Sequence, residues 1–346
     1  MSRADVLRLD CRSDSRFGLP CRWNRKRGYR ELTKSTSLFG TMAAFIARIP
    51  QKHLVIIGGF LGTLAYVLDR RHRRIVRRNL QFTYPRWSRD RIREVARKVF
   101  RNMGTTALEI CQMTCLSRED ILYRVRIKGK HNLLKAKEGP KGAILFSAHI
   151  GNWEMAHVFA ACYLGIHPVM VARKVRPAIL DQWLFGLRTR FGGLILDKRG
   201  ALAKLARVLN RGSLVGILID QGTLRSEGVE VEFFGKATTA TPAAAILARR
   251  FDVPVLPAFC VREADSCLTF IVGAPLSLKK TEDMRFDIRT NTQMMNDAVE
   301  KMVRAYPDQW FWFHKRWKRH YPHLYSEDLA RARRRKERTK ARAGRM

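Results

Sequence analysis

The segment from Lys141 to Leu164 reads KGAILFSAHIGNWEMAHVFAACYL and decides how this chain folds. Its run Ala143–Ala148 is short and almost wholly apolar, which is typical of a buried strand. The run breaks at residues 149–152, where Gly151 permits a tight turn and Asn152 is suited to cap a helix. A helical pattern follows at once. A strand that leads directly into a helix is the repeating unit of α/β domains.

This turn carries His149, and Glu154 follows in the first turn of the expected helix. On one continuous helix, side chains five residues apart point about 140° apart and do not meet. With His149 on the loop, at the strand end where open α/β sheets bind ligands, the Glu154 carboxylate can reach back to the imidazole. A histidine held by an acid through one ring nitrogen can accept a proton through the other. We therefore expect His149 to be a general base for direct attack by a substrate hydroxyl; the alternative is a buried histidine that merely hydrogen-bonds a glutamate.

Strand and helix patterns alternate along the rest of the chain. The expected strands are 125–128, 143–148, 168–172, 193–196, 214–219 and 253–261, and the expected helices between them include 177–191, 201–210 and 242–250. Thr241 with Pro242 and, earlier, Ser88 supply helix starts. This alternation predicts a layered α/β domain with a mainly parallel sheet flanked by helices.

The charge of the chain is extreme. Lys and Arg number 67 against 30 Asp and Glu, a formal net charge of +37, which points to polyanionic partners such as nucleic acid, an anionic membrane, a phosphorylated substrate or an acidic carrier protein. The 7 cysteines lack paired spacing and indicate reduced thiols. Cys111 and Cys115 lie one helical turn apart, but without a second pair we expect no metal site.

The N-terminal part divides into two segments. Residues 1–37 are polar and basic without periodicity, and we interpret them as a disordered arm. Residues 38–74 contain the uncharged run Leu54–Leu68, followed directly by a block of arginines. As a helix this run spans about 22 Å, short of the ~30 Å hydrocarbon core. Basic residues beside an apolar segment favour a membrane anchor that spans or lies half-inserted; a core helix of a soluble domain is the alternative.

Two further clusters are candidates for chemistry. Arginines at 173, 188 and 190 lie near expected strand or helix ends, where they suit phosphate binding or oxyanion stabilisation, although solvated surface is the ordinary alternative. Asp220 and Gln221 follow the strand LVGILI and face the same crevice as His149 if both strands belong to one parallel sheet. The other interpretation of Asp220 is a cap of the next turn. The segment Val229–Gly235 alternates and then becomes apolar, a pattern typical of a hairpin or of a loop that lines an apolar slot.

The segment Asp308–Arg319, DQWFWFHKRWKR, interleaves tryptophan with basic residues. This mixture is typical of a membrane interface or a nucleic-acid stacking surface, and a packed C-terminal helix that contributes tryptophan to the core is the rival interpretation. The tail 326–346 is mostly Arg, Lys and Ala and is expected to be exposed.

In this order, the motifs resemble the bacterial lipid A late acyltransferases, within the broader lysophospholipid acyltransferase superfamily. The resemblance runs from about Leu38 to His320 and rests on four motifs: Arg78-Asn79-Leu80 with Tyr84-Pro85; HIGNWE at 149–154; Asp220-Gln221 with Phe233-Phe234-Gly235; and Trp312, His314, Arg316, Trp317 and Lys318.

The resemblance implies an acyltransferase domain over 75–325, anchored by 38–74 at the cytoplasmic face of the bacterial inner membrane. The fatty acyl chain would pass from acyl carrier protein to a hydroxyl of a lipid A precursor, without a cofactor or metal. His149 would be the base, Glu154 would orient it, and Arg188 would stabilise substrate or oxyanion charge. The residues assigned to substrate binding are Arg173, Arg190, Asp220, Gln221, Asn152 and Trp153.

Several alternatives stay open at this point. The acceptor could be another glycolipid or a lysophospholipid, and Glu154 could pair with His157, one turn further along the helix. A nucleic-acid-binding protein would explain the charge but neither the apolar segment nor the His–Glu loop, and we do not expect nucleic acid as a partner. A catalytically dead scaffold is disfavoured by the intact His149 and Glu154.

Overall fold

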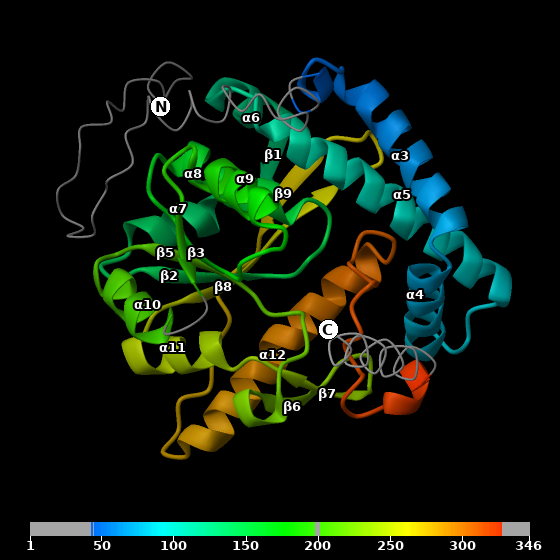
Figure 1. Cartoon of the computed structure of the whole chain (residues 1–346). Helices are drawn as coiled ribbons and strands as arrows, with labels where there is room; N and C mark the ends of the chain where they lie inside the picture. Colours follow the sequence, from blue (N-terminus) through cyan, green and yellow to red (C-terminus); the bar gives the residue numbers. More distant parts are fainter. Residues whose placement is uncertain (1–42, 44, 198–200, 327–346) are drawn as a thin grey trace, which may run out of the picture.

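The structure is a computed structural model that describes residues 43, 45–197 and 201–326 (Figure 1). The expected arm at 1–37 lies outside the described residues, as does the expected tail apart from Ser326. The described chain forms one seven-stranded sheet and a separate two-stranded hairpin. Their strands are β1 Val125–Lys128, β2 Ala143–Ser147, β3 Val169–Ala172, β4 Leu194–Asp197, β5 Leu214–Leu218, β8 Val255–Arg262 and β9 Leu268–Val272 in the sheet, and β6 Val229–Glu232 and β7 Ala237–Ala240 in the hairpin.

The sheet is mostly parallel and has the order β1-β9-β8-β2-β5-β3-β4. All neighbouring pairs are parallel except β8 with β9, which are antiparallel. The predicted α/β class and the mainly parallel sheet are therefore confirmed. The fold also contains strand β9 in the sheet and the separate β6–β7 hairpin. Strand β2 is central, between β8 and β5, which is why its side chains are apolar on both faces.

Helices cover both faces of this sheet (Figure 1). Side chains alternate along β2, so that Ile144 and Phe146 join the core under one helix layer and Ala143 and Leu145 join the core under the other. The first layer includes α10, α11 and α12, and the second includes α6, α7 and α8. The helices are α3 Gln51–Leu68, α4 Arg70–Thr83, α5 Arg89–Met113, α6 Arg118–Arg124, α7 Lys130–Glu138, α8 Trp153–Leu164, α9 Ala178–Thr189, α10 Ala201–Asn210, α11 Ala243–Phe251 and α12 Met284–Ala305, with 3-10 turns at Arg225–Glu227 and Pro322–Tyr325.

Helix starts follow the capping signals closely. Ser88 caps α5 by accepting a hydrogen bond from the backbone N–H of Arg91, and Asn152 caps α8 by accepting one from Met155. Helix α11 begins one residue later than expected, because Pro242 occupies the N-cap position rather than the first turn. Local hydrogen bonding at these caps thus sets where the helices begin.

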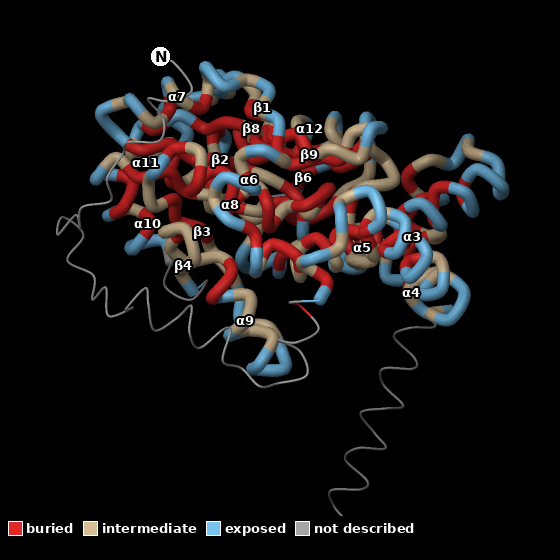
Figure 2. The backbone as a smooth tube through the Cα atoms, turned by 90° about the horizontal axis from the view of Figure 1, so that it is seen from above, coloured by how far each residue is buried: buried red, intermediate tan, exposed pale blue. Residues whose placement is uncertain are grey.

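Helix α3 packs along α5 through glycines. A Cβ on Gly58 would lie 2.5 Å from Thr105 Cα, and one on Gly62 would lie 2.2 Å from the Phe100 carbonyl oxygen, so the two backbones approach too closely for larger residues. Much of the rest of α3 is exposed (Figure 2), and its exposed residues include Ile56, Phe60 and Leu64. Among the described helices, α3 is the one long and apolar enough to cross a membrane, and 22% of its apolar window is buried in the protein.

Candidate active site

Parallel register brings His149 and Asp220 to one edge of the sheet. Ser147 of β2 lies opposite Leu218 of β5, and the two functional residues follow two positions beyond each partner. The His149 Nδ1 lies 2.8 Å from Asp220 Oδ1, and the His149 backbone N–H donates to Asp220 Oδ2 at 3.0 Å. Asp220 therefore fixes both the ring and the backbone of His149.

The Asp220 carboxylate is buried, and its side chain is only 2% exposed. The Trp310 indole N–H donates to Asp220 Oδ2 at 2.8 Å, and the guanidinium of buried Arg316 donates to the Asp220 carbonyl oxygen. Burial alone raises the pKa of this carboxyl, but the charge and hydrogen bond of His149, with Trp310 and Arg316, hold the pKa well below its usual range. Asp220 is thus an anion at neutral pH.

His149 is 20% exposed and presents its other nitrogen outward. The Gln221 side-chain amide lies 3.4 Å from His149 Nε2. Burial lowers the pKa of His149, but Asp220 and, to a smaller extent, Glu154 raise it above its ordinary value. Because the Nδ1 proton is bound to Asp220, Nε2 is the nitrogen that can accept a proton.

Glu154 does not orient His149, contrary to the prediction. Its carboxylate accepts two hydrogen bonds from Arg188 of α9, from Nε at 2.8 Å and from Nη2 at 2.6 Å. The first turn of α8 packs beside α9, so the carboxylate lies toward that helix rather than back toward the loop. Within the described residues no hydrogen bond joins Glu154 to His149. The partner of the histidine is the aspartate that we had also considered as a simple turn cap.

The alternative pairing of Glu154 with His157 is also wrong, since Arg188 takes both carboxylate oxygens. His157 Nε2 is buried without a hydrogen-bond partner among the described residues. Burial lowers the pKa of His157 to about 4, so this ring is neutral.

The other residues predicted to bind substrate fall into two groups: some lie close to His149, and others support the structure around it. Trp153 places its ring 5.2 Å from that of His149, centre to centre, and exposed Gln221 lies beside Nε2. Arg173 is exposed just after β3, at the same carboxyl edge of the sheet. Asn152, by contrast, is fully buried and donates to Glu109 Oε2 at 3.0 Å. It caps a helix instead of facing a substrate.

Arg190 has a structural contact as well. Its guanidinium donates to the carbonyl oxygens of Met113 and Thr114, at 3.1 and 2.6 Å, and so caps the C-terminal end of α5. The expectation that Arg190 binds substrate charge is not supported by this placement. Spacing along the chain could not reveal this role, because the carbonyls come from 76 and 77 residues away.

An apolar slot runs beneath His149 on the α8 face of the sheet. Leu145 and Ser147 of β2, Gly216 and Leu218 of β5, Met170 of β3 and Trp153 of α8 are among its lining residues. About 530 Å³ of space there is not filled by atoms, part of it open to solvent, and the cavity itself has a volume of about 60 Å³. Since Ser147 lies two residues before His149 and Leu218 lies two residues before Asp220, the slot and the His149–Asp220 pair share one face of the sheet.

The segment Val229–Gly235 forms part of a hairpin, which is one of the two structures expected for it. It does not line this slot. Phe233 and Phe234 are buried against the tryptophans of the C-terminal segment, with ring centres 5.5 Å apart for Phe233 and Trp310. The aromatic side chains here build core instead.

The tryptophans at 310, 312 and 317 are at most 1% exposed, so their place in the core is confirmed and an interfacial role for them is wrong. The segment around them is a series of turns rather than a helix. Its backbone also holds the His149 loop, because Phe311 N–H donates to the His149 carbonyl oxygen at 2.9 Å. The hydrogen bonds of Trp310 and Arg316 to Asp220 could not be predicted from the sequence.

Known proteins resemble this chain over most of its length. The family profile described as bacterial lipid A biosynthesis acyltransferase matches residues 24–319. The lipid A biosynthesis palmitoleoyltransferase of Escherichia coli K12 is 22% identical over 273 residues, covering 78% of this chain and 87% of the relative. The lauroyltransferase of the same organism is 24% identical over 275 residues, covering 79% and 88%.

A second group of relatives acts on a different glycolipid by name. The phosphatidylinositol mannoside acyltransferase of Mycolicibacterium smegmatis is 26% identical over 190 residues, covering 54% of this chain and 60% of the relative. Because the lipid A profile spans most of the chain, including the His149 loop and Asp220, this protein belongs to the bacterial lipid A biosynthesis acyltransferase family.

Proposed function

We propose that this acyltransferase moves a fatty acyl chain from a thioester of acyl carrier protein to a hydroxyl of a lipid A precursor. The observation that carries the proposal is the His149–Asp220 pair beside the apolar slot, whose lining residue Trp153 contacts the His149 ring. In this arrangement a chain lying in the slot brings its thioester carbonyl to the imidazole. The net charge of +37 suits an acidic carrier protein and a phosphorylated acceptor.

The chemistry needs no cofactor or metal. His149 Nε2 takes the proton of the acceptor hydroxyl as its oxygen attacks the thioester carbonyl carbon. The imidazolium is stabilised by the buried Asp220 carboxylate. When the tetrahedral intermediate collapses, the new ester forms, the carbon–sulfur bond breaks, and the imidazolium returns the proton to the leaving thiolate.

Charge on the tetrahedral oxygen has two sources of stabilisation close by. Helix α8 begins four residues after His149 and directs the positive end of its dipole at the loop. Arg188 is fixed by Glu154 through Nε and Nη2, so Nη1 is the nitrogen of the guanidinium that Glu154 does not engage. We assign Glu154 the role of positioning Arg188.

The slot is the proposed place of the acyl chain. Between Leu218 and Leu214 of β5, both of which line it, the strand advances about 13 Å. Apolar contacts along this length replace water around each methylene, which favours binding of a fatty chain.

Helix α3 is the proposed membrane contact, at the cytoplasmic face of the inner membrane. Ile56 and Phe60 are 65% and 67% exposed on the face away from α5, and the arginine-rich α4 follows directly. Because one face of α3 is packed on α5, lipid reaches it from the other side, as for an interfacial helix.

Acyl transfer by membranes that contain the wild type or the variant His149→Ala tests the function. The substrates are an acyl carrier protein thioester and a lipid A precursor, and mass spectrometry identifies the product. We expect a rate lower by about 10²–10⁴-fold in the variant, as for loss of a general base. The variant His131→Ala, which removes an exposed histidine in α7, is the control and should keep full activity.

Transfer to another glycolipid is the second candidate, since phosphatidylinositol mannoside acyltransferases are among the relatives. If the wild type acylates a mannosylated phosphatidylinositol and leaves the lipid A precursor unchanged, the acceptor assignment is wrong and the base assignment stands. Full activity of His149→Ala on either acceptor would contradict the site itself.

A further inference from the structure

A cationic cleft, separate from the apolar slot, opens near the His149 loop. It lies between α4 and the C-terminal segment 311–319, and it contains about 1290 Å³ of space not filled by atoms, part of it open to solvent. Its described lining residues include Arg71, Lys318 and Arg319 and no aspartate or glutamate.

The cleft is continuous with the catalytic loop. Gly222, two residues after Asp220, lies in its lining, and so does Phe311. The Phe311 ring centre is 6.1 Å from that of His149 and 6.1 Å from that of Trp153, a residue that lines the slot. His149 therefore contacts one lining residue of each pocket, Trp153 of the slot and Phe311 of the cleft.

Buried hydrogen bonds hold the two walls of the cleft together. Asn79 of α4 donates to the carbonyl oxygens of Trp312 and His314 at 2.7 and 2.9 Å. The Tyr325 hydroxyl donates to Asn79 Oδ1 at 2.6 Å. These bonds fix the two walls relative to each other, so a charged group that enters the cleft requires little rearrangement of the protein.

We propose that this cleft binds a phosphate group on the headgroup of the acceptor lipid and so places an acceptor hydroxyl at His149 Nε2. The inference rests on the proposed function. The slot accounts for the acyl chain, and the cleft is available for the second substrate: its lining residue Gly222 directly follows Gln221, whose amide lies 3.4 Å from His149 Nε2. Arginine and lysine side chains around a concave site are the groups that recognise phosphate.

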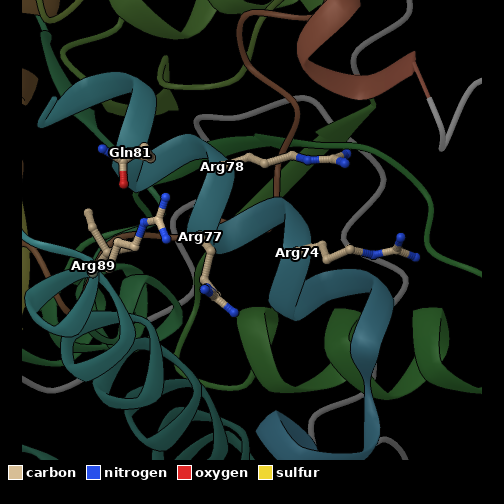
Figure 3. Close-up of a pocket in the computed structure, with 6 residues that line it drawn as sticks. Arg74, Arg77, Arg78, Gln81 and Arg89 are labelled. Carbon is tan, nitrogen blue, oxygen red and sulfur yellow. The ribbon is translucent and has the colours of Figure 1, made fainter.

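An acidic carrier protein is a different occupant, and a different surface suits it better. Arg74, Arg77 and Arg78 of α4, with Arg89 of α5, line a shallow pocket on another face of α4 (Figure 3). This pocket is separate from the residues that line the cleft. Its four arginines come from α4 and from the start of α5 and are half-buried or exposed, so a protein partner can reach them, whereas the cleft is lined by Gly222 and Phe311, next to the His149 loop.

The pocket also provides a control with the same change of charge. The test variant is Arg71→Gln with Arg319→Gln, and the matched control is Arg77→Gln with Arg89→Gln. All four side chains are exposed or half-buried. Arg71 lies in the first turn of α4, where a positive charge opposes the helix dipole, so its loss does not weaken the helix.

Initial rates are measured with purified full-length protein, an acyl carrier protein thioester, and a lipid A precursor with or without its phosphates. For the phosphorylated acceptor we expect the KM of the test variant to rise about 10- to 100-fold, roughly tenfold for each lost charge-assisted contact. The KM for the donor and the low rate with the dephosphorylated acceptor should stay unchanged, and the control variant should match the wild type for the acceptor.

Two results overturn the proposal. One is a test variant whose KM rises for the carrier protein donor and not for the acceptor, which would make the cleft a docking site for the carrier. The other is an acceptor KM that stays within twofold of the wild-type value in the test variant.

Binding to the variant His149→Ala separates this proposal from the catalytic one. Detergent-solubilised phosphorylated glycolipid should bind this variant, and adding the two cleft substitutions should weaken binding by the same 10- to 100-fold. Inorganic phosphate at equal concentration should not displace the lipid; displacement would indicate a site for free phosphate and overturn the assignment. If the wild type transfers no acyl chain and the lipid still binds through Arg71 and Arg319, the proposed function fails and the cleft assignment survives.

Discussion

Replacing Asp220 by asparagine tests which carboxylate directs His149. In the wild type, Asp220 Oδ1 faces His149 Nδ1, while Oδ2 accepts hydrogen bonds from the His149 backbone and the Trp310 indole. An asparagine has one carbonyl oxygen, and two N–H donors require it at the Oδ2 position. The amide NH₂ then faces Nδ1 and stabilises the tautomer that carries its proton on Nε2. That tautomer cannot accept a proton from the acceptor hydroxyl.

The expected loss is about 10³–10⁴-fold in kcat, the size found when an aspartate that orients a catalytic histidine becomes asparagine. The free energy of unfolding should fall by only about 1–3 kcal/mol, because two of the three hydrogen bonds to the carboxylate are kept. Circular dichroism and a thermal melt would show that the variant is folded.

The pH profile gives a second readout with a definite sign. In the wild type the pKa of His149 is raised, so the rate falls on the acid side as pH drops through that raised pKa. In Asp220→Asn the burial that lowers the pKa remains and the main charge that raises it is gone. The acid limb of kcat/KM should therefore move to lower pH while the plateau falls.

The matched variant is Glu154→Gln, which breaks the pair with Arg188 and leaves the Asp220 hydrogen bonds intact. Its acid limb should move less, because Glu154 contributes less than Asp220 to the raised pKa of His149. The reasoning is refuted if Asp220→Asn stays within tenfold of wild-type kcat, or if Glu154→Gln moves the acid limb further than Asp220→Asn does.

Three further predictions concern the slot and helix α3. A Cβ on Gly216 would lie 3.8 Å from Met170 Cβ, which is an ordinary contact, so Gly216→Ala should be tolerated. Gly216→Leu should fill the slot and shift the preference of the enzyme to shorter acyl donors. An unchanged chain-length profile of the products, measured by mass spectrometry, would count against the slot as the place of the acyl chain. Gly62→Ala should lower the free energy of unfolding by about 1–3 kcal/mol, because its Cβ would overlap the Phe100 carbonyl of α5. A melting temperature equal to that of the wild type would contradict the close packing of α3 on α5. Phe60→Asp should leave the melting temperature nearly unchanged and reduce co-sedimentation with vesicles of anionic phospholipid, whereas equal partitioning would argue against α3 as the lipid contact.

The fold could be predicted well wherever apolar runs and capping residues act locally. The strand at Val125–Lys128 and the helix at Ala201–Asn210 have the predicted bounds, and α8 begins where the Asn152 cap indicated. What could not be predicted depends on contacts between distant segments. The hydrogen bonds of Asn79 to residues 233 and 235 positions away join α4 to the C-terminal segment, and no periodicity encodes them.

The misassigned partner of His149 has the same physical origin. Spacing along the chain shows that Glu154 is near His149, and it is, since its charge contributes to the raised pKa of the histidine. Choosing between two nearby carboxylates requires the register of β2 against β5, which aligns Asp220 with the ring, and the position of α9, which brings Arg188 to Glu154. A buried carboxylate takes the strongest donor within reach, and for Glu154 that donor is a bidentate guanidinium. Asp220, 71 residues away in sequence, is left as the acid that holds the base.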